Sequence, residues 1–219
     1  MKLLCLGDSI MQYNDWTTYP QTGWVQLLDR FFVPGFKILN FARNGRSTKS
    51  FIEEGRFDKV LQNAEKGDFA IIQFAHNDEK IQDSSRYTGP EKDGQFRKNL
   101  EFMVNELKKR GVNSILLTPV TRLIFDTELT IKNSHGDYPE AIKETAEKIN
   151  IPCIDLTTLS VKYFESKGQH VSRRYFMNFG EGVYENFPDG KNDNSHLRAD
   201  GAYVICRLFV SELLRLTEK

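Results

Sequence analysis

Short apolar segments recur along the chain and are separated by longer segments with helical spacing. The short ones are strand-sized and show little strict alternation of polar and apolar positions: Leu3–Leu6, Phe36–Phe41, Phe69–Phe74, Ser114–Leu117 and Pro152–Leu156. Continuously apolar strands are typical of a parallel sheet that is covered on both faces. The pattern therefore predicts five parallel strands.

Between these segments, apolar residues recur every three or four positions, which predicts amphipathic helices. The helical faces are Phe57, Val60, Leu61 and Ala64, closed by Gly67; Phe96, Leu100, Met103, Val104 and Leu107, ending before Gly111; Tyr138, Ala141, Ile142, Thr145, Ala146 and Ile149, begun by Pro139; and a last one over about Ala199–Leu216. Strands that alternate with helices predict right-handed β-α-β units in a three-layer α/β/α sandwich. The stretch from Arg173 to Asn194 lacks periodicity and is expected to be a long functional loop.

Composition narrows the function classes. The 219 residues suit one domain over 1–219, and 30 Lys and Arg balance 30 Asp and Glu, so we expect no nucleic-acid partner and no membrane. The three cysteines are far apart and are expected to be small buried hydrophobes. The segment before the first strand is too short for a signal peptide, which predicts a cytoplasmic protein. A secreted chain with its export signal trimmed would give the same sequence.

Polar residues follow the predicted strands, where open α/β sheets bind their ligands. Gly7-Asp8-Ser9 follows the first strand, Asn44-Gly45 the second and His76-Asn77 the third, while Asp193 and His196 precede the last helix. Ser9 has two interpretations. It is a nucleophile, or Asp8-Ser9 caps a following helix, which is the commoner local use of these residue types.

Acyl transfer requires this set of groups. A serine hydroxyl needs a base within hydrogen-bonding reach, and an imidazole is suitable because histidine ordinarily titrates near neutrality. His196 would be that base and Asp193 would orient it, three residues earlier on one helical turn. The N–H of Ser9 at a helix N-terminus, the N–H of Gly45 and the amide of Asn77 would form the oxyanion hole.

Each of these residues also has an ordinary structural interpretation. Gly45 permits a turn with positive φ, Asn77 suits a turn or cap, and Asp193 and His196 are common loop residues. Their joint occurrence after successive strands, in a chain with only four histidines, favours a hydrolase.

The sequence resembles the SGNH (or GDSL) hydrolases, and within them the rhamnogalacturonan acetylesterases. The matching stretches are GDSI with Ser9, NFARNGRSTKSF with Gly45, AHNDEK with Asn77, TPVTRLIF, HGDYPEAI, and DNSHLRADGA, which with Asp193 completes the Asp-x-x-His block. The resemblance spans nearly the whole chain. It implies a flavodoxin-like fold and a serine esterase that hydrolyses O-acetyl esters of rhamnogalacturonan (pectin) oligosaccharides. It also implies no metal or organic cofactor.

The chain departs from the family pattern at three positions. Ala75 stands where relatives usually have glycine, and a positive φ there would strain an alanine. Ser195 and Leu197 replace the more usual Thr and Phe. The role of His76 stays open between substrate contact and structural packing.

The same residue types also allow other interpretations. Asp78 and Glu79 suggest a glycosidase pair, but adjacent loop residues rarely face each other across a scissile bond. Arg43, Arg46, Lys49 and Arg122 could form a basic rim for an acidic polysaccharide, and several aromatic residues could stack on sugars or pack loops: Trp16, Tyr19, Trp24, Tyr175, Phe176, Phe179, Tyr184 and Phe187. The remaining alternatives are a lipase or thioesterase, an esterase of another acetylated glycan such as xylan, and a non-catalytic carbohydrate-binding module.

Overall fold

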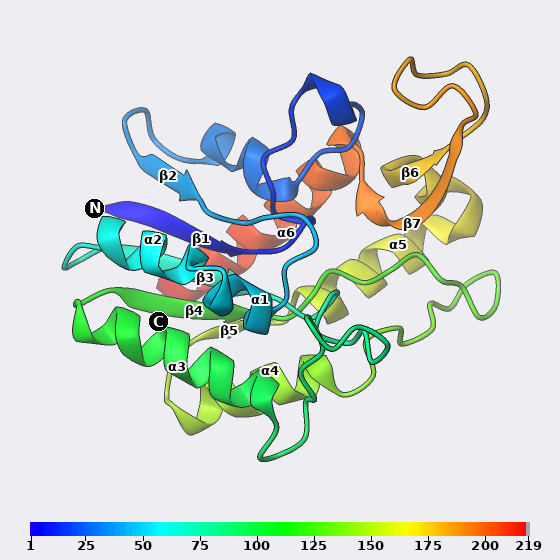
Figure 1. Ribbon diagram of the computed structural model, residues 1–219. Coiled ribbons are helices and arrows are strands. Elements are labelled where there is room, and N and C mark those ends of the chain that lie inside the picture. Colours follow the sequence, from blue (N-terminus) through cyan, green and yellow to red (C-terminus); the bar gives the residue numbers. More distant parts are fainter. Residues whose placement is uncertain (218–219) are drawn as a thin grey trace.

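The computed structural model describes residues 1–217 and contains a central sheet of five parallel strands (Figure 1). They are β1 (Lys2–Gly7), β2 (Lys37–Asn40), β3 (Phe69–Gln73), β4 (Asn113–Leu117) and β5 (Cys153–Ile154). Their order is β2-β1-β3-β4-β5, and each neighbouring pair runs parallel. The predicted five-stranded parallel sheet is confirmed, although β5 is shorter than the apolar segment that indicated it.

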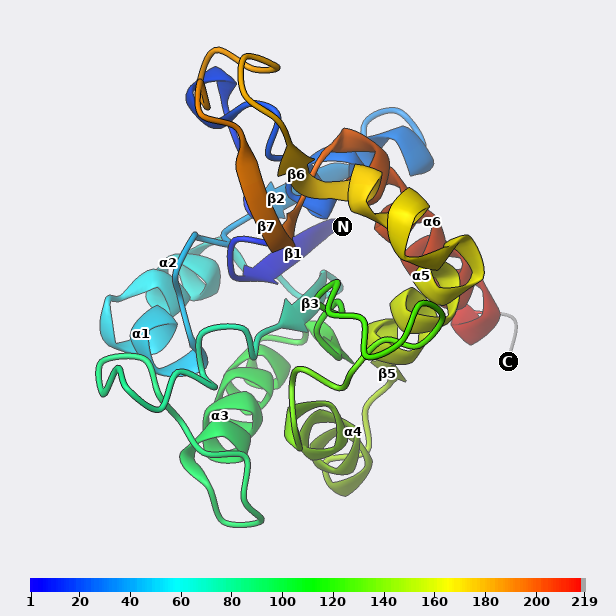
Figure 2. The ribbon, with the colours of Figure 1, turned by 90° about the vertical axis from the view of Figure 1, so that its right-hand side faces the viewer.

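Helices cover both faces of the sheet, and each face has its own core. Leu4 and Leu6 of β1 pack in one core, while Leu3 and Cys5 pack in the other, as alternation along a strand requires. The first face carries α1 (Thr48–Glu53), α2 (Arg56–Asn63), α3 (Gln95–Lys109) and α4 (Tyr138–Lys148), and the second carries η2 (Trp24–Phe31), α5 (Leu156–Ser172) and α6 (Ala199–Thr217) (Figure 2). The predicted three-layer sandwich is confirmed.

The apolar repeat predicts four of these helices and misses three elements. Helices α2, α3, α4 and α6 lie where the periodicity indicated them, and the apolar face of α3 is fully buried. The pattern does not reveal η2, α1 or α5. Helix α1 spans only six residues, and α5 is broken at Gly168, where φ is +71°. The six residues of α1 are too few to show a helical repeat.

The stretch from Arg173 to Asn194 is not the long irregular loop that the sequence indicated. It holds a 3-10 turn, η3 (Arg173–Tyr175), and strand β6 (Phe176–Phe179), which pairs antiparallel with β7 (Lys191–Leu197). Only the segment between the two strands is irregular. Strand β7 is almost entirely polar (KNDNSHL), so its backbone pairing has no apolar signature in the sequence.

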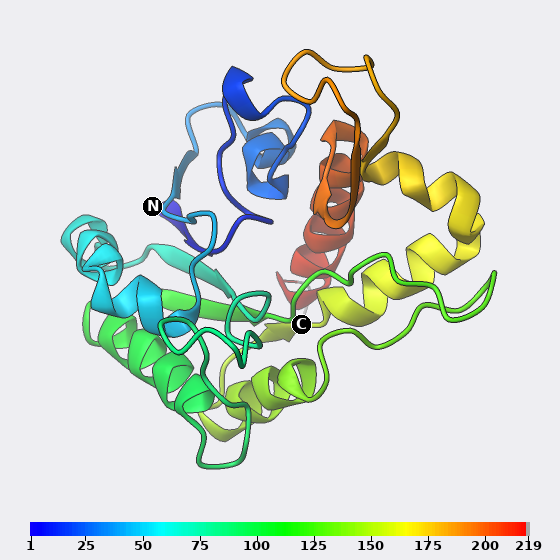
Figure 3. The same ribbon diagram turned by 45° about the vertical axis from the view of Figure 1, so that its right-hand side comes forward.

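The β6–β7 ribbon stands beyond the carboxyl ends of the central strands (Figures 1 and 3). Its connecting loop lies beside η1 (Trp16–Thr18), because the amide of Asn186 donates to the carbonyls of Trp16 at 2.7 Å and Tyr19 at 3.0 Å. The ribbon thereby brings the end of the chain next to the loop that follows β1. Of the helices in residues 1–217, none is long and apolar enough to cross a membrane.

Candidate active site

Ser9 lies in a tight turn directly after β1. The N–H groups of Met11 and Gln12 donate to the carbonyl of Asp8 at 3.2 and 3.1 Å, and that of Ile10 donates to the Asp8 carboxylate at 3.0 Å. No helix continues from this turn, so the expectation that Ser9 caps a helix or begins one is wrong. A Cβ on Gly7 would lie 2.8 Å from the carbonyl oxygen of Gln73, which explains why a glycine precedes the turn. Ser9 is 6% exposed.

Ser9, His196 and Asp193 form one hydrogen-bonded chain. Ser9 Oγ lies 3.0 Å from His196 Nε2, and His196 Nδ1 lies 2.8 Å from Asp193 Oδ2. The other carboxylate oxygen of Asp193 accepts the backbone N–H groups of Ser195 at 2.8 Å and His196 at 3.0 Å. This arrangement favours the tautomer in which Nδ1 donates to Asp193 and Nε2 accepts the serine hydroxyl proton.

The pKa of Asp193 reports the strength of this pairing. Partial burial alone would raise the pKa of its carboxyl group, but the hydrogen bond and charge of His196, with the two backbone donors, hold it well below its usual range. Asp193 therefore stays ionised over the whole working range of most enzymes and can stabilise an imidazolium.

The local geometry that joins Asp193 to His196 differs from the expectation. The two residues lie in strand β7, not on a helical turn. Register breaks at this point of the ribbon, where Met177 pairs with Asp193 and the preceding Phe176 pairs with Leu197. The bulge leaves the backbone between Asp193 and Leu197 unpaired with β6. The Asp193 carboxylate bends this backbone into a turn by accepting the N–H groups of Ser195 and His196.

The groups expected to bind an oxyanion are ready to donate. Gly45 adopts φ +76°, so its position suits glycine for conformational reasons as well. Within residues 1–217, the N–H groups of Ser9 and Gly45 donate no backbone hydrogen bond. The side-chain amide of Asn77 is buried and donates to the carbonyl of Arg46 at 3.1 Å, which ties it to the Gly45 loop.

Asp78 anchors the loop that carries Asn77 to the beginning of α1. Its carboxylate accepts the Thr48 N–H at 2.9 Å and the hydroxyls of Thr48 and Thr88 at 2.6 Å each. Complete burial raises the pKa of Asp78 to about 7, against the opposing effect of these donors. Because α1 follows the Gly45 loop, Asp78 fixes the spacing between the two predicted oxyanion donors.

The structure places His76 in a packed environment. Its Nδ1 lies 3.3 Å from Asp8 Oδ2, and its ring meets that of His135 edge to face at 4.6 Å between centroids. His76 is 5% exposed, behind the turn that holds Ser9. Of the two roles left open by the sequence, these contacts favour packing.

A second buried network braces the Asp193 segment, and no local pattern in the sequence indicated it. Arg122 donates through Nε to Ser195 Oγ at 3.2 Å and forms a short ion pair with Glu79. Burial would raise the pKa of Glu79, but His135 and Arg122 lower it to about 2. Glu79 and Asp78 thus bind different partners and do not face a shared substrate, which argues against the glycosidase interpretation.

The cysteines and the metal-ligating residue types form no evident reactive centre. All three cysteines are unpaired; Cys5 and Cys206 are buried as expected, whereas Cys153 is half-buried. Burial raises the pKa of Cys153 to about 12, so its thiol is a weak nucleophile. Within residues 1–217, no group of three or more His, Cys, Asp or Glu residues is arranged to hold a metal ion.

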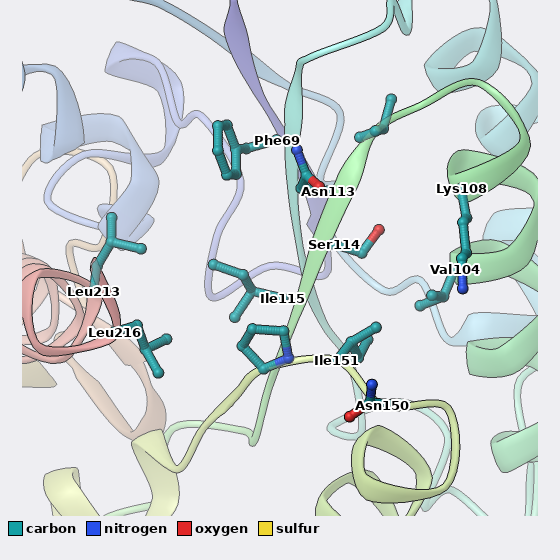
Figure 4. Close-up of a pocket in the computed structure, with 12 residues that line it drawn as sticks. Phe69, Val104, Lys108, Asn113, Ser114, Ile115, Asn150, Ile151, Leu213 and Leu216 are labelled. Atoms are coloured by element: carbon teal, nitrogen blue, oxygen red, sulfur yellow. The ribbon is translucent and has the colours of Figure 1, made fainter. Parts of the chain in front are cut away.

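An apolar cavity of about 530 Å³ lies away from these groups (Figure 4). Phe69 and Asn113, the first residues of β3 and β4, line it together with Ile151 and Leu213. It therefore opens at the amino ends of the strands, the edge opposite Ser9. Among the described residues that line it, Lys108 is the one titratable group.

The fold agrees with comparisons to known proteins. The sequence profile of the GDSL-like Lipase/Acylhydrolase family matches residues 5–202, and the chain belongs to this family. It is accordingly a hydrolase of carboxylic esters.

Individual relatives were found by sequence and by structure. Rhamnogalacturonan acetylesterase RhgT of Bacillus subtilis is 31% identical over 208 residues, which cover 95% of this chain and 87% of RhgT. The crystal structure of protein YxiM from Bacillus subtilis superposes with a TM-score of 0.84 at 25% identity, covering 99% of this chain but 56% of YxiM. The acetyl xylan esterase AlAXEase superposes with a TM-score of 0.67 at 19% identity over 97% of this chain and all of the other, a likeness of fold alone.

Proposed function

We propose that the protein is a serine esterase that removes O-acetyl groups from a carbohydrate, with rhamnogalacturonan oligosaccharides as the first candidate substrate. The observation that carries the proposal is the hydrogen-bonded chain from Ser9 through His196 to Asp193 at the carboxyl edge of the sheet. The similarity to RhgT supports the choice of substrate.

In the proposed mechanism, Ser9 Oγ attacks the acetyl carbonyl carbon while His196 Nε2 accepts the hydroxyl proton. The N–H groups of Ser9 and Gly45 and the amide of Asn77 donate to the tetrahedral oxyanion. Loss of one such donor typically costs about 3 kcal/mol of transition-state stabilisation. The imidazolium then protonates the departing sugar oxygen, and the resulting imidazole deprotonates the water that hydrolyses the acetyl-enzyme.

Replacement of the nucleophile tests the proposal. Ser9→Ala is expected to reduce turnover of p-nitrophenyl acetate by at least about a thousandfold, because no other hydroxyl lies within reach of His196 Nε2 in the described chain. Ser166→Ala, an exposed serine of α5, is the matched control and is expected to keep full activity. Circular dichroism would show that both variants fold. Full activity of Ser9→Ala would refute the mechanism.

Substrate panels separate the alternatives. Acetate release from acetylated rhamnogalacturonan, xylan and p-nitrophenyl esters ranks the glycans, and activity that rises from acetate to octanoate esters would favour a lipase instead. Labelling of Ser9 by a fluorophosphonate would exclude a non-catalytic binding module.

A further inference from the structure

Two cations lie close to the loops of Gly45 and Asn77, which carry predicted oxyanion donors. They are Arg86 and Lys80, on the segment that follows Asn77. The cations that the sequence suggested for a basic rim are mostly engaged elsewhere. Arg46 pairs with Glu54 at 2.8 Å, Lys49 donates to the Ser84 carbonyl at 2.8 Å, and Arg122 belongs to the buried network.

Arg86 lies against the glycine that is expected to bind the oxyanion. Its Nη1 and Cζ atoms are 3.6 and 3.7 Å from the point where a Cβ on Gly45 would sit. Only Nε has an ionic partner, Asp83 at 3.1 Å, and both Nη atoms are without one in residues 1–217. The side chain is 36% exposed. A guanidinium fork is therefore open to solvent next to the reaction centre.

Lys80 adds a second positive charge to the same place. Its N–H donates to the carbonyl of Asn77 at 3.3 Å, one turn from the predicted oxyanion donor. Its ammonium group forms no ion pair in the described part of the chain. Partial burial, followed by the charges of Arg86 and Arg122, lowers its pKa against the opposing charges of Asp83 and Asp8.

The adjoining cavity, of about 270 Å³, extends from Gly45 to Arg86. It also contains Glu53 and Glu54, but Glu54 is neutralised by Arg46 and Arg56 at 2.8 and 3.1 Å. Of the charged residues that line the cavity, Glu53 has no ionic partner within residues 1–217, and Arg86 binds Asp83 through Nε while its two Nη groups are without an ionic partner.

We infer that Arg86, assisted by Lys80, binds a carboxylate of the substrate and so selects acetyl esters on an acidic, uronic-acid-containing glycan. The inference rests on the proposed function for its substrate. The planar fork of Nη1 and Nη2 matches the two oxygens of a carboxylate. The acetyl oxyanion already has three other donors, so the anion that Arg86 receives is a separate group on the sugar.

Arg86→Gln tests this pairing by a ratio of activities. The kcat/KM for acetylated oligogalacturonides, divided by that for acetylated xylo-oligosaccharides, is expected to fall about ten- to hundredfold, mainly through KM. Arg86→Lys is expected to fall between wild type and Arg86→Gln because lysine keeps the charge but not the fork. Arg207→Gln removes an equal charge from the exposed side of α6 and should leave the ratio unchanged. An equal loss on both substrates would overturn the inference, since Arg86 would then serve the oxyanion.

Binding separates this inference from the esterase proposal. In the Ser9→Ala background, calorimetry would measure the affinity for a deacetylated oligogalacturonide and for a xylo-oligosaccharide. We expect Arg86→Gln to weaken only the first, and to reduce its salt dependence. If the acidic probe binds no better than the neutral one, the inference fails even though the esterase is active. If it binds better through Arg86 but Ser9→Ala retains activity, the mechanism fails and the carboxylate site stands.

Discussion

Asp193 gives the imidazole its orientation through two different oxygens. One oxygen binds His196 Nδ1, and the other holds the N–H groups of Ser195 and His196. A single side chain therefore fixes the ring and the backbone that carries it. Because both functions use acceptor oxygens, a carboxamide can reproduce only part of them.

Asp193→Asn is expected to lower kcat for p-nitrophenyl acetate by about a thousand- to ten-thousandfold, because an amide can present a donor to Nδ1 and stabilise the wrong tautomer. Single-turnover kinetics would measure the chemical step directly. Asp189→Asn, an exposed residue of the β6–β7 loop, is the control and should retain wild-type kcat. A loss smaller than tenfold for Asp193→Asn would mean that the aspartate does not orient the base.

Ala75 occupies a backbone conformation that the family usually assigns to glycine. Its φ is +152°, which is unfavourable for an L-residue with a side chain and typically costs about 1–3 kcal/mol. The residue is fully buried directly before His76 and Asn77. The sequence predicts strain at Ala75 if its φ is positive. The φ is positive, so the alanine is strained.

Ala75→Gly should therefore behave unlike an ordinary buried Ala→Gly change. Relief of strain offsets the lost methyl burial and the added entropy of the unfolded glycine, so the free energy of unfolding is expected to stay within about 0.5 kcal/mol of wild type or to rise. Ala70→Gly, in β3 and the same core, is the control and should lose about 1–2 kcal/mol. Urea unfolding measures both. Equal losses at the two positions would show that Ala75 stores no strain.

At the scale of elements, a buried carboxylate joins the two loops that carry Gly45 and Asn77. Asp78 follows β3 and binds Thr48 at the beginning of α1. Tyr138 of α4 donates to the carbonyl of Asp78 at 3.0 Å, so three elements meet there. This junction is buried, and its charge is therefore destabilising in the ionised form.

The pH dependence of stability follows from the raised pKa of Asp78. The folded state holds the proton up to about pH 7, whereas the unfolded state releases it near 3.8, so the stability that the protonated form contributes is lost as pH rises between these values. Asp78→Asn removes this titration. We expect its free energy of unfolding, relative to wild type, to increase between pH 5 and pH 8 in denaturant titrations.

Asp126→Asn, which replaces an exposed carboxylate, is the control. Its free energy of unfolding relative to wild type should stay constant over the same pH range. A relative stability of Asp78→Asn that is constant with pH, or that decreases, would show that Asp78 is ionised in the folded protein at pH 5.

At the scale of the whole molecule, sheet order gathers the predicted catalytic groups. Strands β2, β1 and β3 are neighbours, so the loops with Gly45, Ser9 and Asn77 leave adjacent strands at one edge. The β6–β7 ribbon then supplies Asp193 and His196 from the last fifth of the chain, and Ser9 meets His196 across 187 positions of sequence. The opposite edge holds the apolar cavity and none of these residues.

Features that depend on near neighbours could be predicted from the sequence. Apolar runs and helical repeats are local, so the five strands and the helices α2, α3, α4 and α6 were predictable. The residue types after the strands were also readable, and they pointed to the family to which the chain belongs.

Features that depend on distant partners are visible only in the folded molecule. Strand β7 is polar and obtains its backbone partner from β6, so the bulge that presents Asp193 and His196 has no local pattern. The sequence also does not show which cations are paired. Arg122 pairs with Glu79, 43 positions away, whereas the Nη groups of Arg86 lie beside Gly45 without an ionic partner in the described residues. Periodicity reports burial along one segment, whereas pairing between segments is fixed by topology and packing, which no short stretch of sequence contains.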